Sequence, residues 1–166
     1  MTRSTRQATP IPLILTLIVA ISACTRGPEK PGVDWKTWSK AGIELSHPPG
    51  WTIEVNDPRM DFFTVSVSRP VQGRPVQVLG LYIGGHPDFP LLPEIKHAEL
   101  KRKKLRLGRY QAELIDGDQV GRPGTAEGLI ELGGGDAFHT VHFWFRDLDT
   151  ESRKQVESLL ASIGKR

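Results

Sequence analysis

An apolar run that ends beside the only cysteine limits how this chain can fold. Arg3 and Arg6 form a short positive segment, residues 11–21 are almost entirely apolar, and Cys24 follows two small residues. This layout is typical of a signal peptide, and the run is about half the ~20 apolar residues that a membrane-spanning helix needs. Because Cys24 is the only cysteine, the rest of the chain must fold without an internal disulfide.

The residues Ile21, Ser22, Ala23 and Cys24 resemble the lipobox of bacterial lipoproteins. The resemblance implies cleavage before Cys24, diacylglycerol on the Cys24 sulfur and acylation of the new amino group. Two or more acyl chains hold a protein stably on a membrane, whereas one chain gives only marginal attachment. The alternative is an ordinary secretory signal in which a cysteine happens to lie near the cleavage site.

The residue two places after the cysteine bears on which membrane holds the protein. In lipoproteins of the enterobacterial type, an aspartate at that place marks retention in the inner membrane. Here the residue is Arg26. The resemblance therefore favours attachment to the outer membrane, facing the periplasm, over the inner membrane of the cell envelope.

Removal of the signal peptide changes the charge balance. Residues 1–23 hold two of the 22 basic residues and none of the 19 acidic ones, so the mature chain has 22 minus 2, or 20, basic residues and a net charge of +1. A charge this small argues against a nucleic-acid partner. The Gly- and Pro-rich residues 24–33 are expected to form a tether, and residues 34–166 a single domain.

Two alternating stretches surround a break at the start of this domain. Residues 42–47 and 51–55 alternate apolar and polar side chains, and a Pro-Pro-Gly sequence separates them, so we expect two strands joined by a tight turn. The pattern resembles the opening of PsbP-like and Mog1-like domains, which implies that Trp51 packs into the core. The matching residues are Gly42, Ile43, Leu45, His47, Pro48, Pro49, Gly50 and Trp51.

Further strands are expected from their side-chain patterns. Phe63, Val65 and Val67 would form the core face of a strand over residues 62–68. Residues 76–83 and 137–146 carry apolar side chains on both faces, which indicates central strands. Additional strands are expected over 105–107, 110–115 and 126–132, a hairpin loop over 69–75, and a shaped loop over 84–90.

Two helices complete the expected fold. A short one lies within residues 91–101, and a longer one begins at Thr150 as N-cap and ends before Gly164, burying Val156, Leu159, Leu160 and Ile163. Strands followed by a closing helix predict an α+β domain with an antiparallel sheet flanked by helices. The PsbP-like and Mog1-like resemblance, which extends to Ser162 and Ile163 in the last helical turn, implies an α/β/α sandwich.

The residues that could carry chemistry do not form a recognisable motif. His139 and His142 are three residues apart, so a strand would place them on opposite faces. The other histidines are His47, His86 and His97. The sequence contains no metal-ligand spacing, nucleophile elbow or phosphate loop. We therefore expect no catalytic residues, no metal and no cofactor, with the histidines satisfied within the sheet or loops.

Two surface features remain as candidate contact sites. The loop over residues 84–90 presents His86, Asp88 and Phe89; it is either a contact surface or a cover that buries Phe89. A basic group follows, and it would face lipid headgroups or an acidic partner, or simply protect an edge strand from aggregation. The small net charge favours protection. The basic residues are Lys96, Lys101, Arg102, Lys103, Lys104, Arg106 and Arg109.

Together these features predict a lipoprotein anchored to a membrane of the bacterial envelope. Its domain would be a non-catalytic binding or assembly module with an envelope protein as partner, as PsbP-like and Mog1-like folds generally are. The alternative is an envelope hydrolase or small-ligand-binding protein whose site the sequence does not reveal. The predicted contact surface comprises His86, Asp88, Phe89, Lys101, Arg102, Lys103 and Lys104.

Overall fold

The computed structural model describes residues 34–85, 87–96, 100–134 and 138–165, which form two antiparallel sheets and three helices. Cys24, the expected tether, His86 and His97 lie outside these ranges. The strands are β1 (Lys36–Lys40), β2 (Ile43–His47), β3 (Thr52–Asn56), β4 (Phe62–Val71), β5 (Arg74–Gly84), β6 (Lys103–Leu107), β7 (Tyr110–Asp116), β8 (Ala126–Glu131), β9 (Thr140–Phe145) and β10 (Gly164–Lys165). The helices are α1 (Pro93–Lys96), the 3₁₀ helix η1 (Gly117–Val120) and α2 (Thr150–Ala161).

The larger sheet has the strand order β3-β4-β5-β9-β8-β7-β6. Strand β9 is therefore its centre and β5 its direct neighbour, which confirms the central positions predicted from their apolar character. Every pair of neighbours in this sheet is antiparallel. The α+β class with an antiparallel sheet is thus the observed architecture.

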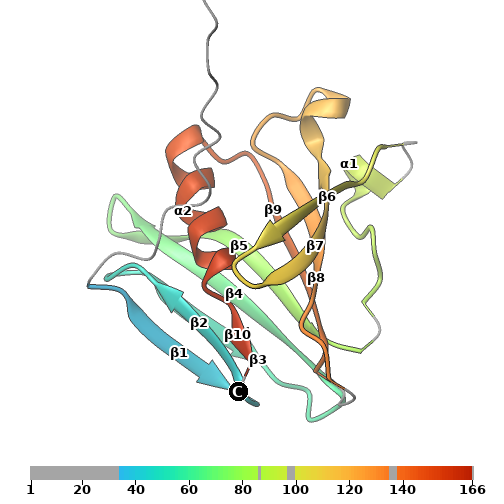
Figure 1. The fold of residues 1–166 in the computed structure, drawn as a ribbon. Coiled ribbons are helices and arrows are strands. Elements are labelled where there is room, and N and C mark those ends of the chain that lie inside the picture. Colours follow the sequence, from blue (N-terminus) through green and yellow to red (C-terminus); the bar gives the residue numbers. More distant parts are fainter. Residues whose placement is uncertain (1–33, 86, 97–99, 135–137, 166) are drawn as a thin grey trace, which may run out of the picture.

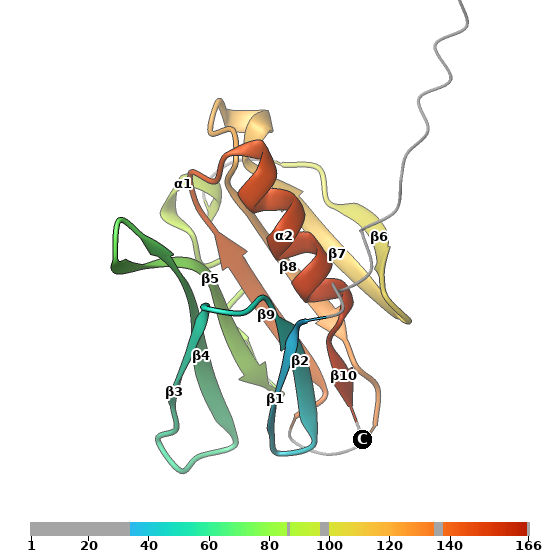
Figure 2. The ribbon, with the colours of Figure 1, turned by 90° about the vertical axis from the view of Figure 1, so that its left-hand side faces the viewer.

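Each face of the larger sheet has its own cover. The core face carries Phe63, Val65 and Val67, which are buried as predicted, and α2 packs on it through Val156, Leu159 and Leu160. Trp51 is partly buried against this core. Figure 1 shows α1 on the opposite side of the sheet from α2, and Figure 2 shows the small sheet on the same side as α2.

The first two predicted strands form, but they do not pair with each other. Strand β2 lies between β1 and β10 in the smaller sheet, whereas β3 pairs with β4 at the edge of the larger one. The expected hairpin between them is therefore wrong. Pro48, Pro49 and Gly50 redirect the chain from one sheet to the other, and Gly50 has the positive φ of 82° that glycine tolerates.

The ends of α2 also differ from expectation. Asp149, and not Thr150, is the N-cap, because its side chain accepts a hydrogen bond from the Ser152 N–H. The helix ends at Ser162 as C-cap. Gly164 then begins strand β10 beside β2, so its predicted role at the helix end is wrong.

Smaller differences concern loop lengths. Strand β4 continues to Val71 and β5 begins at Arg74, so the hairpin loop expected over residues 69–75 is reduced to Gln72 and Gly73. Of the short helix expected over residues 91–101, the structure describes α1 alone. None of the helices in the described ranges has the length and apolar character that a membrane crossing requires.

Candidate functional site

A buried carboxylate and a histidine meet on the face of the larger sheet that is opposite α2. Glu127 on β8 and His142 on the adjacent strand β9 are 0% and 1% exposed, and His142 Nε2 lies 2.7 Å from Glu127 Oε1. An ionised carboxylate only accepts hydrogen bonds, so the hydrogen in this contact is carried by Nε2. Buried polar groups need hydrogen-bond partners, and each of these side chains supplies one for the other.

Glu127 also holds the segment that covers it. We call residues 87–96 and 100–102, which lie between β5 and β6, the strap. The Leu91 N–H donates to Glu127 Oε1, and the Leu92 N–H donates to Oε2 at 2.8 Å. Both carboxylate oxygens are therefore engaged by the backbone of the strap, and one by His142 as well. The arrangement fastens the strap to the sheet.

Aromatic side chains pack around His142 and help to cover the buried pair. The Phe89 ring lies 5.6 Å from the His142 ring in an edge-on arrangement, and the Trp144 ring lies 5.3 Å from His142 on the same strand. The guanidinium of Arg102 lies 4.9 Å from the centre of the Phe89 ring. Of the two interpretations of Phe89, the structure favours the cover, because this side chain is partly buried over the pair.

An apolar cluster separate from the main core supports the strap. Leu92 and Ile95 of the strap are buried against Ile115 of β7, and Leu100 packs beside them. At its end, the strap is tied to η1 by two hydrogen bonds between the Lys101 backbone and the Gln119 side chain, of 2.9 and 3.0 Å. The strap is thus held by packing, by Glu127 and by Gln119.

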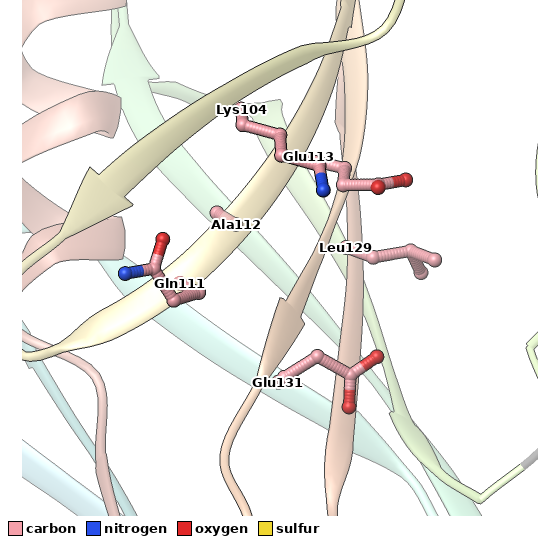
Figure 3. Close-up of a pocket in the computed structure, with 6 residues that line it drawn as sticks. All are labelled: Lys104, Gln111, Ala112, Glu113, Leu129 and Glu131. Atoms are coloured by element: carbon pink, nitrogen blue, oxygen red, sulfur yellow. The ribbon is translucent and has the colours of Figure 1, made fainter.

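Beyond the strap, the same face of the sheet is open and hollowed. A depression of about 400 Å³ lies over β6, β7 and β8. Figure 3 shows Glu113, Leu129 and Glu131 extending to one side from β7 and β8. Its lining residues are Lys104, Gln111, Ala112, Glu113, Leu129 and Glu131. The mixture of charged and polar side chains with the apolar Ala112 and Leu129 would suit a small polar ligand.

The predicted contact residues separate into two groups in space. Asp88 is exposed and lies 3.5 Å from Lys96, and Phe89 beside it packs inward. The basic residues Lys101, Arg102, Lys103 and Lys104 are all exposed at the end of the strap and the start of β6. Arg102 belongs to the basic group and connects it to the other group, because its guanidinium lies over the Phe89 ring. The same guanidinium also contacts Glu113.

The other two described histidines, His47 and His139, lie in or beside strands. His47 is buried in β2, with Nδ1 3.0 Å from the Pro48 carbonyl oxygen, and His139 immediately precedes β9. In the described part of the chain, no three His, Cys, Asp or Glu side chains gather closely enough to hold a metal ion.

Sequence analysis missed Glu127 altogether. A signal was present, because Glu127 is the one charged residue among residues 126–130 of β8. Pairing of β8 with β9 places Leu129 opposite His142, so Glu127 lies diagonally across from that histidine. Comparisons of the chain with protein-family models, with curated proteins and with solved structures find no match.

Proposed function

We propose that this chain is a lipoprotein of the bacterial envelope, anchored by acylated Cys24, whose domain is a non-catalytic binding or assembly module. The observation that carries the proposal is the sequence Ile21, Ser22, Ala23 and Cys24 at the end of a signal-like apolar run. The mature protein faces the periplasm, and the outer membrane is favoured over the inner one as its site of attachment. Its fold is a PsbP-like or Mog1-like α/β/α sandwich.

The described site supports a binding role over a catalytic one. A general acid or base must come within hydrogen-bond reach of its substrate. Glu127 and His142 are instead enclosed, and the carboxylate is engaged by the Leu91 and Leu92 backbone. The exposed residues Asp88 and Lys101–Lys104 surround this cover and form the proposed contact surface.

A specific observation favours a second candidate, a small-ligand-binding protein. The hollow of about 400 Å³ beside Lys104, Glu113 and Glu131 is within the size range of small-molecule sites. A tightly bound small molecule in protein purified from its own membranes, with no protein partner recovered by crosslinking, would favour this candidate.

Labelling of the chain with an alkyne fatty acid in bacteria tests the proposal. We expect the label on the wild-type chain, sedimentation with membranes, and loss of both in the Cys24→Ser variant. Crosslinking of the acylated protein in its own membranes should then recover an envelope protein. An unmodified Cys24 thiol, or a Cys24→Ser variant that still requires detergent for release, would contradict the anchor.

A further inference from the structure

The edge of the larger sheet carries an unusual concentration of positive charge. Five of the six residues from 101 to 106 are Lys or Arg, and residues 101–112 contain no acidic residue. The basic side chains are all exposed. We define the basic edge as Lys101, Arg102, Lys103, Lys104, Arg106 and Arg109.

Most of this charge is not held in close ion pairs among the described residues, although Lys103 lies near enough to Asp116 to lower the pKa of that carboxyl. Among the described residues, only Arg102 of the basic edge has a carboxylate within 4.0 Å, that of Glu113 at 3.3 Å. Arg109 donates to the Lys165 carbonyl oxygen at 2.7 Å, a neutral acceptor that leaves its charge uncompensated. Charges that protect an edge strand lie on that strand, whereas Lys101, Arg102 and Arg109 lie outside β6, so protection does not account for the whole group.

The geometry of β6 suits contact with a broad anionic surface. Strand β6 is the last in the sheet and has one hydrogen-bonded neighbour, β7, so backbone N–H groups along its outer edge face away from the sheet. Figure 2 shows β6 at this edge. Lys104 and Arg106 alternate with Leu105 and Leu107, of which Leu107 is buried. Long basic side chains and edge N–H groups can therefore meet the same surface.

We propose that the basic edge binds the anionic phospholipid headgroups of the membrane that anchors the protein. This inference rests on the proposed function, because the anchor places that surface within reach. The ten residue-to-residue steps from Cys24 to Asp34 span at most about 35 Å, a length comparable with the width of a small domain. Anchoring also converts headgroup binding into an intramolecular contact, so weak attraction is enough to orient the domain.

Lipid headgroups explain the basic edge better than an acidic protein does. A bilayer presents many phosphates in one plane, and electrostatic attraction to them needs no matching shape. Of the basic edge, only Lys104 lines the hollow over β6, β7 and β8, so the other basic side chains offer charge outside that hollow. Each basic residue close to an anionic leaflet strengthens binding about fivefold. The effect acts over roughly the Debye length, about 8 Å at physiological salt.

Vesicle binding of the unacylated mature chain tests the inference. The probe is residues 24–166 with Cys24→Ser, mixed with vesicles of equal parts phosphatidylglycerol and phosphatidylethanolamine or with phosphatidylcholine vesicles. We expect binding to the anionic vesicles alone, and a fall in binding as salt rises. Changing Lys101, Lys103, Lys104 and Arg106 together to Gln should weaken binding by about a hundredfold or more.

A matched variant controls for net charge. Lys36, Arg74, Arg122 and Lys154 are exposed cations outside the basic edge, and their joint change to Gln removes the same charge. This control should retain nearly all vesicle binding, and circular dichroism should show both variants folded. Equal losses in the two variants, or equal binding to neutral and anionic vesicles, would overturn the inference. Binding to polyglutamate but to neither vesicle would overturn it in favour of an acidic protein partner.

The anchor and the basic edge can fail separately. If Cys24 carries no lipid but the unacylated chain still binds anionic vesicles through Lys101, Lys103, Lys104 and Arg106, the proposed function fails and this inference stands. If Cys24 is acylated but the unacylated chain ignores anionic vesicles, the anchor stands and this inference fails.

Discussion

His142 donates through Nε2 to Glu127 Oε1 at 2.7 Å, at a position where neither side chain reaches solvent. The same carboxylate accepts the Leu91 and Leu92 N–H groups, so a single side chain joins two strands of the sheet to the strap. Breaking a buried pair by removing one partner is costly, because the other is left without compensation.

We expect Glu127→Gln to lower the free energy of unfolding by about 2 kcal/mol, since an amide oxygen cannot accept all three donors and one is left unsatisfied. Denaturant unfolding measures the change, and hydrogen exchange at Leu91 and Leu92 should quicken. Glu131→Gln on the same strand, where the side chain is exposed, should be near neutral. Equal effects of the two substitutions would contradict the fastening role of Glu127.

Close approach of a ring makes Gly80 a second sensitive position. A Cβ built on Gly80 would lie 2.2 Å from the Trp144 indole, so Gly80→Ala must displace that ring. We expect a loss of about 1–3 kcal/mol, the usual range for overpacking, and a change in near-ultraviolet circular dichroism. The control is Gly164→Ala, whose Cβ would have no neighbour nearer than 3.9 Å. A Gly80→Ala protein as stable as this control would contradict the predicted displacement.

The ion pair between Asp116 and Arg153 predicts a pH dependence. Burial raises the pKa of Asp116, but hydrogen bonds from Arg153 and from the Asp118 N–H outweigh it and hold the pKa below its ordinary value. A carboxyl group whose pKa is lower in the folded than in the unfolded protein stabilises the fold at pH values above its unfolded pKa of about 3.9. This stabilisation is lost as the pH falls through the folded pKa.

Asp116→Asn should therefore lower stability near neutral pH and flatten its decline in acid. A change of up to about 1 kcal/mol is expected, because the pair is partly exposed and screened by solvent. Urea unfolding between about pH 2 and pH 7 measures both effects. Asp118→Asn changes an exposed carboxylate in the same turn and serves as the control. A steeper acid decline in Asp116→Asn than in wild type would contradict the sign.

Ser162 joins the end of α2 to the small sheet. Its hydroxyl accepts the Ser46 N–H at 2.9 Å and donates to the Leu159 carbonyl oxygen at 2.6 Å. Ser162→Ala should cost about 1 kcal/mol and accelerate hydrogen exchange at Ser46, because that donor loses its partner. Ser39→Ala, at an exposed position of β1, should leave both measurements unchanged.

Local patterns in the sequence predicted the elements well where one face or both are buried. Phe63, Val65 and Val67 alternate along β4, and β9 carries large apolar side chains on both faces beside His142, so period and burial agree. The helix start was wrong by one residue because Asp149 and Thr150 are both good N-caps. The structure identifies Asp149 as the N-cap through the hydrogen bond from the Ser152 N–H. N-cap propensity alone does not distinguish Asp149 from Thr150.

Contacts between distant segments could not be predicted in the same way. Strand β2 pairs with β1 and also with β10, which lies far along the chain, and residues 42–55 contain nothing that specifies β10 as a partner. Glu127 is likewise satisfied by Leu91 and Leu92, which lie 35 or 36 residues earlier. The basic edge was visible in the sequence as a run of Lys and Arg residues. That only Arg102 has a carboxylate within 4.0 Å could be learned only from the positions of the described carboxylates in the structure.

The small sheet has a consequence for the order in which the protein can assemble. Ser46 and Ser162, which join it to α2, are 116 residues apart, so β2 emerges from a ribosome or export channel long before β10 can pair with it. Until then one side of β2 is an unprotected edge, and contacts of such long range form slowly. In a newly made chain this side of β2 therefore stays open to other strands until β10 pairs with it.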